Sequence, residues 1–169
     1  MILYHGSNMA VQTPDLSLCR PFKDFGRGFY LTSLPDQAEQ MAYRTARIFG
    51  GQPIVTSYAF DDSALSSSQL KVKIFDGPSE EWALFVINNR DKKFSPKDSP
   101  MCNHQGQYDI VMGPVANDDL ALLFRTFSRG LIDIEALVKG MRYKKLNNQY
   151  SFNSQKALFL LERLGDRHV

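Results

Sequence analysis

Two stretches decide how this chain folds: Leu3-Tyr4-His5-Gly6-Ser7 and Asp24-Phe25-Gly26-Arg27-Gly28-Phe29-Tyr30-Leu31-Thr32. Each places a ring with a polar edge, His5 or Tyr30, inside an apolar run and beside glycine. Glycine has no Cβ, so a backbone segment or a flat ligand can approach it closely. We therefore expect two short strands, at 2–4 and 29–32, that carry a ligand site between them.

Strands and helices alternate around these stretches without a repeat or an interdomain linker. Further strands are expected over 54–60, 70–75, 108–112 and 150–152. Helices are expected over 36–49, from 78–81 through about 89, from 117 to about 127, over about 133–139 and from 154 through 164. The polar stretch 91–107 has no period and is expected to be a long loop. Because the strands outnumber a parallel βαβ rhythm and are unevenly spaced, the pattern favours an α+β fold in one domain, 1–169.

Composition excludes several classes of protein. At 169 residues the chain is long enough to bury a sizeable core without a metal or disulfide. The formal charge is only +2, which gives no argument for a nucleic-acid footprint or a membrane surface. Cys19 and Cys102 lack metal-ligand spacing and are expected to be reduced thiols. No apolar run approaches the roughly 20 residues that cross a bilayer, and no secretory signal is evident, so we expect a cytoplasmic protein.

The two opening motifs resemble signatures of a known enzyme superfamily. Tyr4-His5-Gly6-Ser7 and the stretch 25–30 are similar to the His-Gly-Ser and Phe-Gly-Lys-Gly-Ile-Tyr motifs of the diphtheria-toxin and poly(ADP-ribose) polymerase branch of ADP-ribosyltransferases. The whole chain resembles a bacterial family of small uncharacterised domains usually placed in that superfamily; supporting stretches are 81–82, 89–90, 108–111, 113–118 and 149–152. The resemblance implies an ADP-ribosyltransferase-like split antiparallel β-core with flanking helices, binding NAD in a cleft without a metal.

The chemistry implied by this resemblance needs positioning groups more than titrating ones. Breaking the bond between nicotinamide and ribose builds positive charge on the sugar, while nicotinamide leaves as a neutral molecule. By resemblance, His5 binds the adenosine-side ribose, the Gly6 backbone pairs with the nicotinamide amide, and Ser7 offers a hydroxyl to ligand or loop. Tyr30 stacks on nicotinamide. Taken singly, His5 also fits a structural histidine and Tyr30 a core residue.

The third catalytic position departs from the family pattern. Chain-elongating relatives carry Glu in an Asn-Glu-Tyr context, where this chain has Asn148-Gln149-Tyr150. Glutamine can hydrogen-bond a ribose hydroxyl but cannot act as a general base near neutral pH. We therefore expect an NAD-dependent mono-ADP-ribosyltransferase with His5, Tyr30 and Gln149 as its catalytic residues and a protein or nucleic acid as acceptor. The alternative is an inactive module that binds NAD or ADP-ribose, or contacts proteins.

The remaining candidates have two interpretations each. Arg90 is a candidate for binding the pyrophosphate, or it pairs with Glu81 or Asp91. Tyr43 is a candidate second stacking ring. Glu81 and Asp118 could serve as a base or simply begin helices. Domains of this kind occur in toxin–antitoxin and defence contexts, so the resemblance implies a neutralising antitoxin or immunity protein as a partner by analogy.

Overall fold

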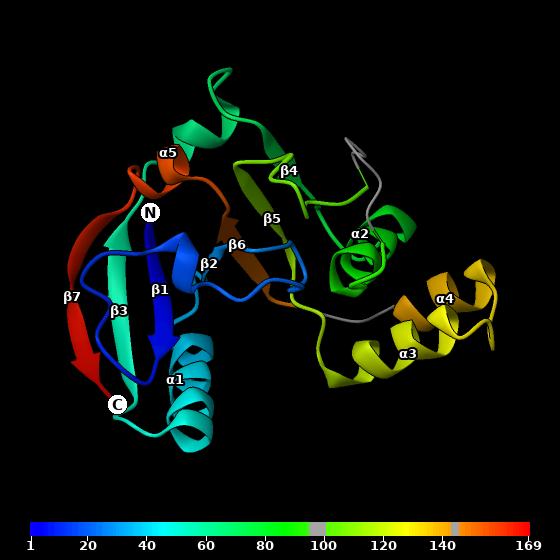
Figure 1. Ribbon diagram of the computed structural model, residues 1–169, viewed down its shortest axis with the longest axis horizontal. Helices are drawn as coiled ribbons and strands as arrows, with labels where there is room; N and C mark the ends of the chain where they lie inside the picture. Colours follow the sequence, from blue (N-terminus) through cyan, green and yellow to red (C-terminus); the bar gives the residue numbers. More distant parts are fainter. Residues whose placement is uncertain (95–100, 143–145) are drawn as a thin grey trace.

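The computed structural model describes residues 1–94, 101–142 and 146–169, which form two β-sheets and five α-helices (Figure 1). The first sheet, sheet A, has the antiparallel order β1 (Ile2–Ser7), β3 (Ile54–Ala59), β7 (Glu162–His168). The second, sheet B, has the order β2 (Phe29–Leu31), β6 (Asn148–Phe152), β5 (Ile110–Pro114), β4 (Val72–Ile74). Only the β4–β5 pair in this order is parallel. The described part of the chain is thus α+β, as the sequence predicts.

Among the described residues, the two sheets are joined by an isolated bridge between Tyr4 of β1 and Thr32, which directly follows β2. Tyr4 and Thr32 exchange both backbone hydrogen bonds, with N···O distances of 2.8 and 3.0 Å. Beyond this pair each strand continues in its own sheet, β1 beside β3 and β2 beside β6. The expected neighbouring strands are therefore present, and they separate next to His5.

Apolar side chains fill the space between the sheets and cover their outer faces. The inner cluster contains buried residues of both sheets and of α5 (Gln155–Leu158), among them Leu3, Phe29, Leu31, Tyr58, Ile110, Phe152 and Leu158. On the outer face of sheet B, α2 (Glu80–Arg90), α3 (Asp118–Ser128) and α4 (Ile134–Met141) form a second cluster. Helix α1 (Pro35–Phe49) packs on sheet A beside β1 (Figure 1). Two short 3-10 helices cover 16–18 and 62–66.

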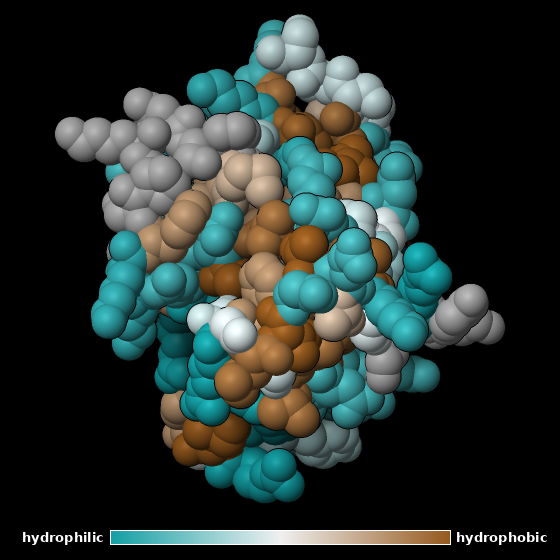
Figure 2. Space-filling model, turned by 90° about the vertical axis from the view of Figure 1, so that its right-hand side faces the viewer, coloured by the Kyte–Doolittle hydropathy of each residue, from teal (hydrophilic) through white to brown (hydrophobic). Residues whose placement is uncertain are grey.

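Figure 2 looks onto the end of the molecule that α3 and α4 form. Apolar side chains gather in the middle of this face, with polar ones around them. Leu122 of α3 and Leu131, in the turn before α4, are 60% and 71% exposed. Among the described residues no helix combines the length and the apolarity needed to cross a membrane.

The helix starts follow from capping side chains that the sequence displays. Ser79, Asn117, Asp133 and Ser154 each accept a hydrogen bond from the backbone N–H three residues later. Helix α1 ends at Gly50, whose φ of 76° is open to glycine without strain. These local signals explain why α1 to α4 form close to their predicted positions.

The expected final helix over 154–164 is wrong. Helix α5 ends at Leu158, and Glu162–His168 form strand β7 along β3. Long-range pairing thus overrides the helical pattern of this segment. Other boundaries shift less: His5 lies inside β1, Gly113 and Pro114 belong to β5, and Gly140 belongs to α4. In the expected loop 91–107, residues 91–94 and 101–107 form no helix or strand, and 95–100 lie outside the described residues.

Candidate functional site

Tyr30 of β2 holds the backbone of the glycine-rich stretch before it. Its hydroxyl accepts a hydrogen bond from the Phe25 N–H at 2.9 Å and donates one to the Gly26 carbonyl at 2.8 Å. The Phe25 carbonyl in turn accepts bonds from the side-chain amides of Asn103 and Asn153, both at 3.1 Å. The motif is therefore a backbone segment fixed on two sides, and the Tyr30 hydroxyl is engaged in holding it.

His5 lies where β1 leaves β2, and its ring is bound to the β2 backbone. The Nδ1 atom is 2.8 Å from the carbonyl oxygen of Tyr30, and the ring centroid is 4.3 Å from that of Phe29. Because a carbonyl only accepts, Nδ1 carries the hydrogen and Nε2 of the neutral ring is an acceptor. Desolvation lowers the pKa of His5 from its ordinary value, and this outweighs the hydrogen bond to Tyr30, which raises it. The imidazole is thus a neutral group with one acceptor to offer.

The two predicted rings point to different sides of β2. Phe29 belongs to the inner cluster, whereas Tyr30 packs against the cluster outside sheet B. Since side chains alternate along a strand, the imidazole on Phe29 lies on the face opposite the phenol. His5 and Tyr30 therefore lie on opposite faces, which corrects the expectation of one ligand site between the two rings. A ligand in contact with both must pass the edge where β1 and β2 separate.

The backbone amide and carbonyl of Gly6, a buried residue, are directed toward this edge. The amide and carbonyl of every second residue point the same way along a strand, so those of Gly6 point to the β2 side, as those of Tyr4 do. The Tyr30 carbonyl, which continued pairing would place opposite Gly6, is bound by the imidazole instead. A Cβ on Gly6 would lie 1.9 Å from the carbonyl oxygen of Ala38, so close packing of α1 also requires glycine here.

Gln149 and Arg90 meet at the carboxylate of Asp24. Arg90 places Nε 2.9 Å and Nη2 2.7 Å from Oδ1, while Nε2 of Gln149 is 3.2 Å from Oδ2. The Asp24 side chain is 14% exposed. Tyr30 lies close by: burial chiefly, and then the charge of Asp24, raise its pKa well above the ordinary value, so it remains a phenol. Gln149 and Arg90 thus bind one carboxylate, whose charge also acts on Tyr30.

Two other predicted ligand residues lie at the surface or bind locally. Tyr43 is 54% exposed on α1 and makes no ring contact with Tyr30 in the described structure. The Ser7 hydroxyl donates a weak hydrogen bond of 3.4 Å to Asn8. Their predicted contacts with NAD remain predictions.

The two acidic candidates at helix starts, Glu81 and Asp118, lie in the first turns of α2 and α3. Glu81 forms an ion pair with Lys73 of β4, and Asp118 is exposed in the first turn of α3. Arg90 pairs with Asp24, a partner that the sequence does not suggest.

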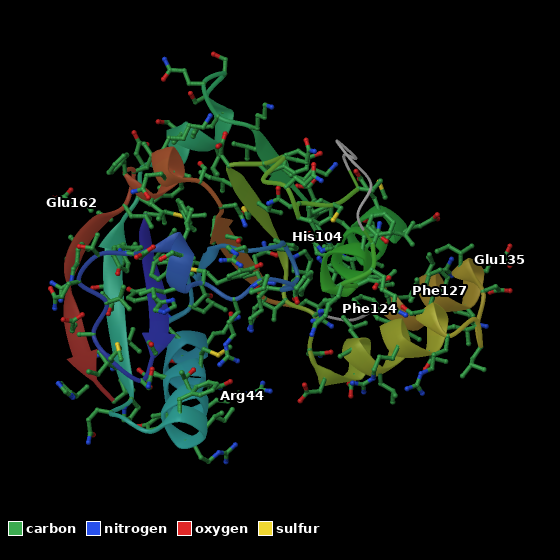
Figure 3. The ribbon with its side chains drawn as sticks, viewed as in Figure 1. Arg44, His104, Phe124, Phe127, Glu135 and Glu162 are labelled. Atoms are coloured by element: carbon green, nitrogen blue, oxygen red, sulfur yellow. The ribbon has the colours of Figure 1, made fainter. Side chains whose placement is uncertain are left out.

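Sequence reasoning missed three residues that build the site: Asp24, Asn103 and Asn153. Asp24 directly precedes the glycine motif, and Asn153 directly follows β6, but only the tertiary structure shows their partners. The loop that contains Asn103 packs on α2, where His104 Nε2 lies 2.8 Å from the Asn89 carbonyl (Figure 3). In the part of the chain that the structure describes, no group of three His, Cys, Asp or Glu residues could hold a metal ion.

Two surface hollows are lined by residues other than the predicted catalytic ones. One, of about 240 Å³, is lined by Leu34, Pro35, Asp36, Gln37, Gln40 and Asn147. The other, of about 380 Å³, is lined by Ser63, Ala64, Ser67, Gln69, Leu70, Lys156 and Leu160. Neither includes His5, Tyr30 or Gln149. The candidate site is thus defined by its hydrogen bonds and residue types rather than by either hollow.

No curated protein and no solved structure matches this chain in the comparisons with known proteins. A family model with the description "Protein of unknown function (DUF3990)" matches residues 1–162. The chain therefore belongs to the DUF3990 family.

Proposed function

We propose that this protein is a mono-ADP-ribosyltransferase with a split β-core like that of ADP-ribosyltransferases, which cleaves NAD and transfers one ADP-ribose to a protein or nucleic acid. One observation supports the proposal above all. The stretch 24–30 links the three residues expected to act: His5 binds the carbonyl of Tyr30, and Gln149 binds Asp24. Residues from β1, β2 and β6 are thus tied to one backbone segment.

The groups around this segment suit a dinucleotide in distinct ways. Nε2 of the neutral His5 ring accepts a hydrogen bond from a ribose hydroxyl. The Gly6 backbone edge offers one N–H and one C=O, which match the carbonyl and amide of nicotinamide. Tyr30 has a ring that its own hydroxyl bonds hold in place, and such a ring provides a fixed surface for a flat base.

The proposed transfer needs no protein acid. A nucleophilic atom of the acceptor bonds to the anomeric carbon of the nicotinamide ribose while the carbon–nitrogen bond breaks. The electron pair of that bond goes to the ring nitrogen, so nicotinamide leaves neutral, and the proton of the acceptor goes to solvent. Gln149 cannot take this proton, which favours an acceptor that is already nucleophilic and argues against chain elongation.

A second candidate function follows from the same residue. The Gln149 amide has no titratable proton and is bound to Asp24, which equally favours a module that binds NAD or ADP-ribose without cleaving it. Release of nicotinamide distinguishes the two functions.

The test combines NAD binding by calorimetry with nicotinamide release by chromatography. Asparagine at position 5 places a donor where Nδ1 of His5 lies, so His5→Asn can keep the bond to Tyr30 while losing the Nε2 acceptor. We expect the wild type to release nicotinamide, and His5→Asn to do so at least about tenfold more slowly with an unchanged circular dichroism spectrum. His168→Asn, the same change at an exposed position of β7, is the matched control.

Each outcome selects one function. Binding without release would identify the binding module. No NAD binding by the wild type would refute both functions, and equal release by the wild type and His5→Asn would remove His5 from the site.

A further inference from the structure

We infer that Asp24 is a positioning residue that orients the Gln149 amide, so that Oε1 rather than Nε2 is offered to a ribose hydroxyl. The identity of this ligand rests on the proposed function. The orientation rests only on the contacts among Asp24, Arg90 and Gln149.

Each oxygen of the Asp24 carboxylate binds a different partner. Arg90 binds Oδ1 through Nε and Nη2, at 2.9 and 2.7 Å, and Gln149 Nε2 lies 3.2 Å from Oδ2. A carboxylate can only accept and a guanidinium can only donate. Gln149 must therefore turn its NH2 group toward Asp24, which directs Oε1 away from the carboxylate.

The oriented amide lies on the side of sheet B that carries Tyr30. Tyr30 of β2 is directly opposite Ser151 of β6, and Gln149 is two residues before Ser151. Side chains two apart on a strand share a face, so Tyr30 and Gln149 are diagonal neighbours. Gln149 is only partly buried, which leaves its oxygen within reach of a ligand beside the Tyr30 ring.

This arrangement also favours Gln at the position where the chain-elongating enzymes that the chain resembles carry Glu. A glutamate at 149 would place a second carboxylate about 3 Å from Asp24, and one arginine would have to serve both. Gln149 avoids this repulsion. It still supplies an oxygen that accepts a hydrogen bond, although it does not supply a base.

Asp24→Asn should reverse the polarity of the site. Arg90 would keep the side-chain oxygen of the new asparagine, whose NH2 group would then face Gln149. The Gln149 amide would have to turn over and offer Nε2, a donor, to the ligand. Combining Asp24→Asn with Gln149→Glu should restore the acceptor, because the glutamate can accept from the asparagine NH2 with one oxygen and from a hydroxyl with the other.

The experiment compares the wild type, Asp24→Asn, Gln149→Glu and the double variant by calorimetry with NAD and by thermal unfolding. Asp76→Asn and Gln12→Glu are matched controls at exposed positions. We expect each single variant to bind NAD at least about tenfold more weakly and the double variant to recover to within about threefold of the wild type. Double-variant binding no tighter than that of either folded single variant would overturn the inference.

A readout that needs no ligand separates this inference from the proposed function. Asp24→Asn should shift the Gln149 side-chain NH2 signals in ¹⁵N-resolved NMR spectra and speed their exchange with water, since they lose the carboxylate. Unchanged signals would overturn the orientation, whatever NAD does. Conversely, a wild type that fails to bind NAD but shows these changes would refute the proposed function and the ribose contact while keeping Asp24 as the residue that orients Gln149.

Discussion

Replacing Gly6 by alanine should destabilise the protein strongly, because the space beside its Cα is occupied by helix backbone. A Cβ at this position would lie 1.9 Å from the Ala38 carbonyl oxygen and 2.8 Å from the Ala42 nitrogen. Both are main-chain atoms of α1, so no change of rotamer relieves the contact. Either α1 must move away from β1 or the β1 backbone must shift.

The size of the effect follows from the cost of overpacking. Extra methylene groups in a packed interior cost about 1–3 kcal/mol, and a clash with helix backbone belongs at or above the upper end. For a chain of this size each kcal/mol lowers Tm by about 2–4 °C, so we expect Gly6→Ala to lower it by roughly 6–12 °C. Gly77 has no atom within 4 Å of the place that a Cβ would occupy, and Gly77→Ala should change the unfolding free energy by less than about 0.5 kcal/mol.

Thermal and urea unfolding followed by circular dichroism measure both variants. A Gly6→Ala protein that unfolds within about 1 °C of the wild type would show that α1 does not lie against β1 as described. A large loss in Gly6→Ala together with an unchanged Gly77→Ala would show that the fold itself requires the glycine of the first motif.

Three further predictions concern residues around the site. Burial lowers the pKa of His5, so the full stability of the folded state with a neutral ring is present above pH 6.5, the ordinary pKa of histidine. This stability is lost as the pH falls from 6.5 toward the lowered pKa of the folded state. Between about pH 7 and 5, Tm should therefore drop more in the wild type than in His5→Asn. Asp109 accepts hydrogen bonds from the Lys71 N–H at 2.8 Å and from Lys156 at 2.9 Å, and although burial raises its pKa, such bonds outweigh this effect and lower it. Asp109→Asn should therefore lower the free energy of unfolding, measured in urea at pH 7, by about 1–3 kcal/mol. This difference from the wild type should shrink as the pH falls below the ordinary Asp pKa of 3.8. Tyr30→Phe removes the hydroxyl that holds Phe25 and Gly26 but keeps the ring, so urea unfolding should show a free energy of unfolding lower by about 1–3 kcal/mol. NAD affinity, measured by calorimetry, should change less than about threefold. An affinity loss as large as that of Tyr30→Ala would contradict the stacking role.

Local signals in the sequence predict much of the helical structure. Asn117 caps α3 as expected, and α1 ends at Gly50, because caps and helix ends depend on residues within one turn. The segment 162–168 is different. Its pairing with β3 joins Thr56 to Asp166, 110 residues apart, and no local pattern reveals such a partner.

The sequence likewise predicts the local features of the candidate site but not those that depend on long-range contacts. The sequence predicts His5 and Tyr30 on neighbouring strands, and the Tyr4–Thr32 bridge confirms that neighbourhood. The direction of each ring depends on strand register, which long-range pairing sets. Asp24 could not be assigned either, since its partner Gln149 lies 125 residues away.

The most direct test of the proposed transfer incubates the purified protein with adenylate-labelled NAD and a cell lysate. It measures the nicotinamide released and the label on protein or nucleic acid. We predict free nicotinamide and label on protein or nucleic acid with the wild type, and at least about tenfold less of both with His5→Asn. No nicotinamide from the wild type, or equal amounts from the two proteins, would contradict the assignment of this site to ADP-ribose transfer.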